Sequence, residues 1–193
     1  IDEDDIAAVT ECLRSDFLTQ GPQTRAFEEA VSAYVGAGHA VAVSNGTAAL
    51  HLVCIALGLG AGGLLWTSPN SFVASANAGR YLGADVGFVD IDPQTGSIDP
   101  DALEAKLIAV SAAGRKPDIL IAVHFAGHTQ GFDRVAALCT EHGVALVEDA
   151  AHAFGAAYED RPDQMVGSHP QSAAATFSFH PLKSITTGEG GMI

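Results

Sequence analysis

Short runs of consecutive apolar residues alternate along this chain with longer segments in which apolar residues recur every three or four positions. The short runs are typical of strands buried on both faces, and the longer segments of amphipathic helices. Strands are expected at residues 40–43, 64–67, 86–89, 119–123, 144–147 and 173–179. Helices are expected at residues 6–13, from 22, 48–57, 72–82, from 100, and from about 135 to 142. The alternation predicts an α/β fold, a mostly parallel sheet with helices on both faces.

Two predicted helices have an apolar face that should contact the core. These faces consist of Phe27, Ala30, Val31 and Tyr34 in one helix, and of Leu103, Leu107 and Val110 in the other. In parallel sheets, ligands bind beyond the carboxyl ends of the strands. The candidate positions are therefore residues 44–47, 68–72, 124, 148–149 and 178–183.

Gly58, Gly60 and Gly63 have the spacing G-x-G-x-x-G of dinucleotide-binding loops. Such a loop needs a strand before it and a helix after it, because the helix N-terminus binds the pyrophosphate. Here a predicted helix precedes the glycines and a predicted strand follows them. We interpret the segment as a flexible turn and reject a dehydrogenase.

The chain of 193 residues has 9 Lys and Arg against 23 Asp and Glu, a formal charge of −14. Binding to nucleic acid or to anionic lipid requires clustered basic residues, so both classes are disfavoured. The most apolar stretch, residues 52–66, is shorter than the roughly 20 residues of a membrane helix. Cys12, Cys54 and Cys139 are widely spaced, which favours free thiols over disulfides or a zinc site. We expect a cytoplasmic protein without a bound metal.

The segment Ser44-Asn45-Gly46-Thr47 leads from a predicted strand into a helix. A glycine there allows close approach, and the first N–H groups of the helix and the Thr47 hydroxyl can bind an anion. An ordinary helix N-cap has the same residue types.

A carboxylate, Asp149, follows a wholly apolar strand, and His152 comes three residues later. Burial of the carboxylate is costly unless a cation or an N–H group meets it, and a protonated ring nitrogen would do so. The alternatives are that Asp149 caps the next turn and that His152 is structural.

Lys183 follows the last long apolar run and lies among small, apolar and hydroxyl residues. A lysine beside apolar residues loses its proton more easily and becomes nucleophilic. Lys106 and Lys116 are expected at the solvated surface, and a surface loop is also the alternative for Lys183. An anion site, a carboxylate for a ring nitrogen and a nucleophilic lysine together match pyridoxal 5′-phosphate.

With these residues in place, the chain resembles the DegT/StrS family of sugar-nucleotide aminotransferases, which have the fold of type I pyridoxal phosphate (PLP) enzymes. The matching motifs are Asp16-Phe-Leu-Thr-Gln-Gly-Pro, Ser44-Asn-Gly-Thr-Ala-Ala-Leu, Asn70-Ser-Phe-Val-Ala-Ser-Ala-Asn, Glu148-Asp-Ala-Ala-His and Ser178-Phe-His-Pro-Leu-Lys. The last motif and the Thr-Thr-Gly-Glu-Gly-Gly that follows are most similar to the aminotransferases of the pseudaminic acid pathway.

The resemblance implies a role for each matched position. Lys183 forms the internal aldimine and moves the proton, and Asp149 pairs with the pyridine N–H. The remaining cofactor contacts it implies are Thr47, the Ala48 amide and Ser178 at the phosphate, Phe72 on the ring face, and His152 near the phenolic oxygen.

The resemblance also implies the reaction, in which an amino group passes from glutamate to C4 of a UDP-linked 4-keto-6-deoxy amino sugar. Family members are about twice as long and work as homodimers. Residues 1–193 are therefore expected to be an incomplete PLP-binding large domain without the smaller C-terminal domain. The loop Thr19-Gln20-Gly21 is a candidate for substrate contact.

Four other interpretations remain. The protein could aminate a different nucleotide-linked keto-sugar, or be a non-catalytic sensor or binding module with the same fold. Dehydratases of the family have His in place of the lysine, which Lys183 argues against. In a purely structural α/β domain, the three chemical features would be coincidences.

Overall fold

The computed structural model describes residues 1–112 and 114–193. The helices are α1 (Glu3–Arg14), α2 (Pro22–Val35), α3 (Gly46–Ala56), α4 (Ala74–Tyr81), α5 (Pro100–Ala112) and α6 (Phe132–His142), with a 3-10 turn η1 at Phe125–Gly127. The strands are β1 (Ala42–Val43), β2 (Leu64–Thr67), β3 (Asp85–Phe88), β4 (Ile119–Val123), β5 (Ala145–Asp149), β6 (Ala157–Tyr158), β7 (Arg161–Met165), β8 (Ala174–Ser178) and β9 (Gly191–Met192). The predicted alternation of strands and helices is confirmed.

A seven-stranded sheet has the order β1-β9-β8-β5-β4-β2-β3. Strands β3, β2, β4, β5 and β8 are parallel. At one side of the sheet β9 pairs antiparallel with β8, and β1 pairs antiparallel with β9. The predicted mostly parallel sheet is therefore confirmed. The carboxyl ends of β4, β5 and β8 meet at one edge, which defines where a ligand should bind.

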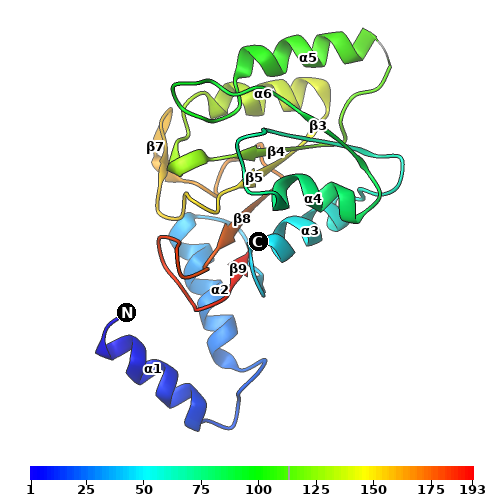
Figure 1. Ribbon diagram of the computed structural model, residues 1–193. Helices are drawn as coiled ribbons and strands as arrows, with labels where there is room; N and C mark the ends of the chain where they lie inside the picture. Colours follow the sequence, from blue (N-terminus) through cyan, green and yellow to red (C-terminus); the bar gives the residue numbers. More distant parts are fainter. Residues whose placement is uncertain (113) are drawn as a thin grey trace.

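Helices cover both faces of this sheet (Figure 1): α5 and α6 lie on one face, and α3 and α4 on the other. The alternation of side chains along β4 explains both layers. Leu120 and Ala122 pack into the core of the α5 and α6 face, whereas Ile119 and Ile121 pack into that of the α3 and α4 face. A run of five apolar residues is thus required, because each face of the strand is covered.

The first two helices lie at the periphery (Figure 1). Helix α1 has no buried residue, although its apolar residues recur at helical spacing. Helix α2 buries Val31 and Val35, with Phe27 against Phe179 at 5.1 Å between ring centroids. The prediction that Tyr34 belongs to the buried face is wrong, and Ala30 is exposed as well. The buried positions of α2 are spaced four residues apart and form a narrow stripe.

The hairpin of β6 and β7 was not predicted. Strand β7 contains Pro162, Asp163 and Gln164, which are exposed and form no apolar run. The segment of Gly58, Gly60 and Gly63 connects α3 to β2, so a helix precedes it and a strand follows it. This order confirms the interpretation as a turn.

No helix within residues 1–112 and 114–193 is long and apolar enough to cross a membrane. The described part of the chain also contains no group of three or more His, Cys, Asp and Glu side chains arranged to hold a metal ion.

Candidate functional site

A cavity of about 550 Å³ lies at the carboxyl ends of β4, β5 and β8, beside the N-terminus of α3. Six of the seven predicted site residues line it: Thr47, Phe72, Asp149, His152, Ser178 and Lys183. They come from four separate segments of the chain. Ala48, the seventh, follows Thr47 in the first turn of α3, and its side chain is not part of the lining.

The N-terminus of α3 forms one end of the cavity. Asn45 is its N-cap residue, and its Oδ1 accepts the Ala48 N–H at 2.8 Å. The cap residue expected as the alternative is therefore present, next to the predicted anion site. The N–H groups of Gly46 and Thr47 precede the first intrahelical bonds and are free of helical partners. They and the positive end of the helix dipole favour an anion at this end.

Gly46 allows this helix end to approach β8. A Cβ atom at position 46 would lie 3.0 Å from Ser178 Cβ, which is closer than nine in ten real Cβ contacts. The contact brings the Ser178 hydroxyl beside the first turn of α3. Glycine at this position thus joins two hydroxyl-bearing segments, those of Thr47 and Ser178, into one anion-binding end.

Asp149 is the last residue of β5 and is only 6% exposed. Its Oδ2 accepts a hydrogen bond from Ser75 Oγ at 2.7 Å, and its Oδ1 accepts the Ala151 N–H at 3.3 Å. By accepting the Ala151 N–H, Asp149 caps the next turn, which was the alternative role considered from the sequence. This role uses only one of the two carboxylate oxygens. Within the described ranges, no ion pair reaches Asp149. A buried carboxylate with no cation suits a protonated ring nitrogen in the cavity.

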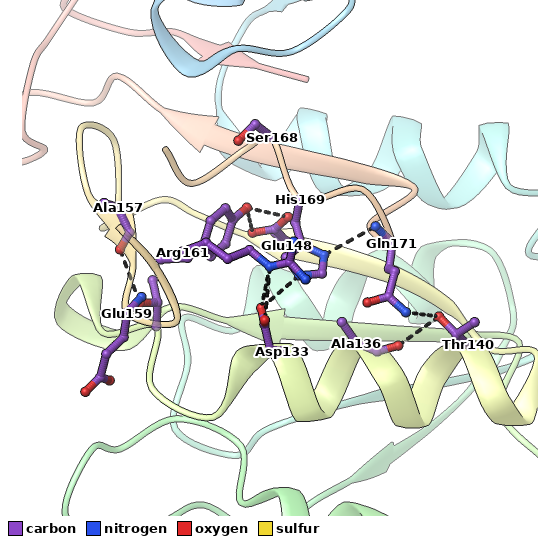
Figure 2. A network of polar contacts seen from close by, with 12 residues as sticks. Asp133, Ala136, Thr140, Glu148, Ala157, Glu159, Arg161, Ser168, His169 and Gln171 are labelled. Carbon is purple, nitrogen blue, oxygen red and sulfur yellow. Dashed lines mark hydrogen bonds and ion pairs between the residues drawn. The ribbon is translucent and has the colours of Figure 1, made fainter. Parts of the chain in front are cut away.

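On the opposite face of β5, Glu148 belongs to a separate polar network (Figure 2). It is fully buried and bonds His124 Nε2 at 2.7 Å and the Tyr158 hydroxyl at 2.8 Å. Burial and the adjacent Glu148 raise the pKa of Tyr158 well above its usual range, so its hydroxyl remains a donor. This network lies outside the cavity lining and stabilises the strand that carries Asp149.

A second part of the network in Figure 2 joins α6 to the segment before β8. Asp133 accepts hydrogen bonds from Arg161 Nε and His169 Nε2, both at 3.0 Å. Burial raises the pKa of Asp133, but the bonds from Arg161 and His169 outweigh burial and lower it overall. The carboxylate therefore stays charged and ties these segments together.

Lys183 follows β8 in a loop that is stabilised by hydrogen bonds to backbone carbonyls within the loop. The Lys183 N–H donates to the His180 carbonyl at 2.9 Å, and Thr186 Oγ1 donates to the Phe179 carbonyl at 3.0 Å. Phe179 is fully buried and anchors the loop. The Lys183 side chain is half-buried in the cavity wall, so it does not take the exposed position expected as its alternative.

The other two lysines lie outside the cavity lining. Lys116 Nζ bonds the His142 carbonyl at 2.9 Å near the surface. Lys106 was expected to be solvated, but its Nζ lies 4.4 Å from the centroid of the Trp66 ring and bonds the Phe88 carbonyl. Burial there lowers the pKa of Lys106.

His152 lies at the cavity mouth, where its Nδ1 accepts the Ala126 N–H at 3.4 Å. Its pKa is lowered by burial and by the positive charge of Lys183, and the negative charge of Asp149 opposes this shift. His152 thus experiences both Lys183 and Asp149 across the same space. No salt bridge within 4.0 Å joins these two residues in the described part of the chain.

Phe72 is 74% exposed although it is a large aromatic residue. Its ring lines the cavity and is not part of the core, where an ordinary phenylalanine would be expected. An exposed aromatic ring at a cavity mouth is suited to stacking on a flat ligand. Together with the anion-binding end, the cation-free carboxylate and the lysine, it makes the cavity fit pyridoxal phosphate.

Several lining residues have no predicted role. Asn70, His180 and Glu189 lie within motifs that the resemblance quotes, but no chemistry was assigned to them. His180 Nε2 and Glu189 Oε1 are 4.0 Å apart. Ser75, whose hydroxyl bonds Asp149, was also missed, because nothing in a run of small residues indicates which hydroxyl contacts a distant carboxylate.

Comparison with known proteins gives consistent matches over the whole chain. The family model described as the DegT/DnrJ/EryC1/StrS aminotransferase family matches residues 1–193. The chain is 42% identical over 193 residues to the spore coat polysaccharide biosynthesis protein SpsC of Bacillus subtilis (strain 168), covering all of this chain and 47% of SpsC. It is 40% identical over 195 residues to the UDP-4-amino-4,6-dideoxy-N-acetyl-beta-L-altrosamine transaminase of Campylobacter jejuni (strain 81-176). This match covers 100% of this chain and 49% of the transaminase. The chain spans about half the length of the curated relatives it matches.

Solved structures agree with these relatives. PseC of Helicobacter pylori, an aminotransferase involved in the biosynthesis of pseudoaminic acid, has a TM-score of 0.89 and 34% identity, covering 100% of this chain and 49% of PseC. Spr1654 of Streptococcus pneumoniae in its PLP form has a TM-score of 0.86 and 30% identity, covering 100% of this chain and 50% of Spr1654. The same protein has also been solved in its PMP form, with a TM-score of 0.85.

Proposed function

Because this chain belongs to the DegT/DnrJ/EryC1/StrS aminotransferase family, we propose that the protein transfers an amino group from glutamate to a UDP-linked 4-keto-6-deoxy amino sugar. Pyridoxal phosphate is the cofactor of this family, and Spr1654 adopts both its PLP and its PMP form. The observation that carries the proposal is that Lys183 and Asp149, from different segments, line one cavity.

When bound, the cofactor supplies a carbonyl that exchanges amino groups and a ring that takes up electrons. The residues of this chain hold and orient it. Thr47, the Ala48 amide and Ser178 bind the phosphate at the end of α3, although the Ala48 N–H must then be shared with Asn45. Phe72 covers one face of the ring.

Two side chains handle protons. Asp149 accepts the N–H of the ring nitrogen and keeps that proton in place, since its buried carboxylate lacks another cation among the described residues. Lys183 Nζ would hold the cofactor at its carbonyl carbon, where the C–N bond forms as the carbonyl oxygen leaves as water, and the free amine would accept and return the proton of the substrate carbon. His152 would hold the oxygen beside that carbonyl, and burial lowers its pKa in the unliganded protein.

The relatives support the substrate class. The relative from Campylobacter jejuni is a transaminase of a UDP-linked amino sugar, and PseC acts in the biosynthesis of pseudoaminic acid. A second candidate is a different nucleotide-linked keto-sugar. The match to SpsC, a polysaccharide biosynthesis protein with 42% identity, favours this candidate.

The organisation of the protein is part of the same proposal. Residues 1–193 form an incomplete PLP-binding large domain of a cytoplasmic homodimer, and a smaller C-terminal domain completes the substrate site. Matches that cover 47–50% of the relatives are consistent with such a division. The loop Thr19-Gln20-Gly21 remains a candidate for substrate contact.

The full-length gene product tests the proposal. We expect it to purify yellow, and borohydride to attach a pyridoxyl group to Lys183, located by peptide mass spectrometry. A panel of UDP- and dTDP-linked keto-sugars with glutamate then identifies the acceptor by the aminated product. The adduct on another residue, or no adduct, would contradict the proposed site, and no aminated sugar would contradict the reaction.

A further inference from the structure

The hydroxyl group of Ser75 contacts the carboxylate of Asp149. Ser75 is the second residue of α4, is fully buried and is not among the lining residues. Its Oγ lies 2.7 Å from Asp149 Oδ2, across 74 residues of sequence. In the described part of the chain, this is the one side-chain hydrogen bond that the Asp149 carboxylate receives.

The protons of this cluster can be assigned from its donors and acceptors. A hydroxyl has one proton to donate, and a carboxylate only accepts. Ser75 Oγ therefore donates to Asp149 and accepts from Ser71 Oγ, which lies 2.6 Å away. The result is a directed chain from Ser71 through Ser75 to Asp149 Oδ2.

The same turn carries the ring of Phe72. The Ser75 N–H donates to the Phe72 carbonyl at 3.2 Å, and Ser75 Oγ lies 3.3 Å from that carbonyl. Phe72 and Asp149 are the predicted contacts with the face and the nitrogen of one ring. Ser75 therefore bonds to both of the segments that must be aligned with the same ring.

We propose that Ser75 is a positioning residue that fixes the carboxylate plane of Asp149, so that a free lone pair points at the ring nitrogen of the cofactor. The inference rests on the proposed function. Without Ser75, the carboxylate keeps the 3.3 Å bond from Ala151 N–H and can turn about its Cβ–Cγ bond. A carboxylate held before binding loses less conformational freedom when the ligand arrives.

The test measures affinity for the cofactor in full-length apo protein by equilibrium dialysis. The probes are pyridoxal phosphate and its 1-deaza analogue, in which a C–H replaces the ring nitrogen. Ser75→Ala should weaken binding of pyridoxal phosphate about ten-fold, the size of one hydrogen bond to a charged group. Binding of the 1-deaza analogue should stay within about two-fold of that by the unsubstituted protein, because the analogue has no ring N–H to orient.

Three variants complete the design. Ser71→Ala removes the donor to Ser75 and should give a smaller loss of about three-fold. In an Asp149→Ala background, Ser75→Ala should have no further effect, because its acceptor is gone. Ser68→Ala is the matched control. Its buried hydroxyl lies between β2 and α4, as Ser71 does, but it is not part of the cavity lining and has no partner in the described structure, so cofactor affinity should not change.

An equal loss with both probes would show a general structural defect and overturn the inference, as would an unchanged affinity for pyridoxal phosphate. In both cases the unsubstituted protein still binds the cofactor, and the proposed function stands. An unsubstituted protein that binds neither probe would overturn both. Should Ser75→Ala not fold, Ser71→Ala decides by the same comparison of the two probes.

Discussion

Glu148 and Asp149 are neighbours in β5, yet their carboxylates lie on opposite faces of the sheet, 2.7 Å from His124 Nε2 and from Ser75 Oγ respectively. Alternation along a strand separates them. One carboxylate is fully enclosed by protein donors, whereas the other lines a cavity. The two acidic residues should therefore respond differently to removal.

Replacing Glu148 should affect stability, and replacing Asp149 should affect cofactor binding. Glu148→Ala leaves the buried donors of His124 and Tyr158 unpaired, so the free energy of unfolding should fall by about 3–5 kcal/mol. Asp149→Ala leaves the Ser75 hydroxyl and the Ala151 N–H without this acceptor, but it also removes a buried carboxylate that has no cation partner in the described structure. Because the two effects oppose each other, the free energy of unfolding should change by less than about 1 kcal/mol. Urea unfolding and cofactor dialysis on both variants check this contrast. A loss of stability from Asp149→Ala as large as that from Glu148→Ala would contradict it.

Lys183→Ala should reduce amino transfer at least about a thousand-fold, because the nucleophile and the proton-transfer group are lost together. The variant should still bind pyridoxamine phosphate, which needs no covalent bond to the lysine. Steady-state assays and dialysis measure the two effects. Lys116→Ala is the control, since its Nζ bonds the carbonyl of His142 near the surface. Comparable rates for the two variants would refute the role of Lys183.

Gly46→Ala should weaken binding of phosphate-bearing ligands. The new Cβ would lie 3.0 Å from Ser178 Cβ, so we expect the first turn of α3 and the end of β8 to separate by a few tenths of an ångström. We expect an affinity for pyridoxal phosphate about ten-fold lower, with little change for pyridoxal, which lacks the phosphate. Gly60→Ala is the control, because nothing lies within 4 Å of its added Cβ. An equal loss of affinity for pyridoxal would show that Gly46 does not act through the phosphate group.

The pKa of His152 should report its two charged neighbours in the apo protein. Protonated imidazole is repelled by Lys183 and attracted by Asp149, so Lys183→Ala should raise the pKa and Asp149→Asn should lower it. NMR titration of the imidazole resonance, assigned with His152→Asn, measures both shifts. Shifts of the same sign in the two variants would show that the three side chains do not face one space.

The strands and the cavity were predictable for a physical reason. Runs such as residues 64–67 and 119–123 are apolar on both faces because both faces are covered, and they match β2 and β4 at both ends. Parallel strands bring their carboxyl ends together, which is why Asp149 and Lys183 could be expected at one edge. Phe72 came only from the resemblance, since an exposed aromatic and a core aromatic look alike in sequence.

What could not be predicted depends on packing between distant segments. Helix α1 has helical periodicity but no buried residue, and the stripe of α2 runs through Val35 and not Tyr34. Periodicity gives a helix and its apolar residues, but not the neighbour it meets. The role of Ser75 depends on a contact across 74 residues, which no local pattern contains.

The turn before α3, residues 44–47, packs against β9, which is synthesised much later than the turn itself. Val43 pairs with Gly191, and a Cβ atom at position 191 would lie 2.5 Å from the carbonyl carbon of Asn45. We therefore expect residues 44–47 to reach their final conformation only after β9 has been synthesised and has left the exit tunnel of the ribosome. Nascent chains should therefore bind pyridoxal phosphate only late in synthesis. A chain truncated before residue 191 should lack a complete binding site for the phosphate group.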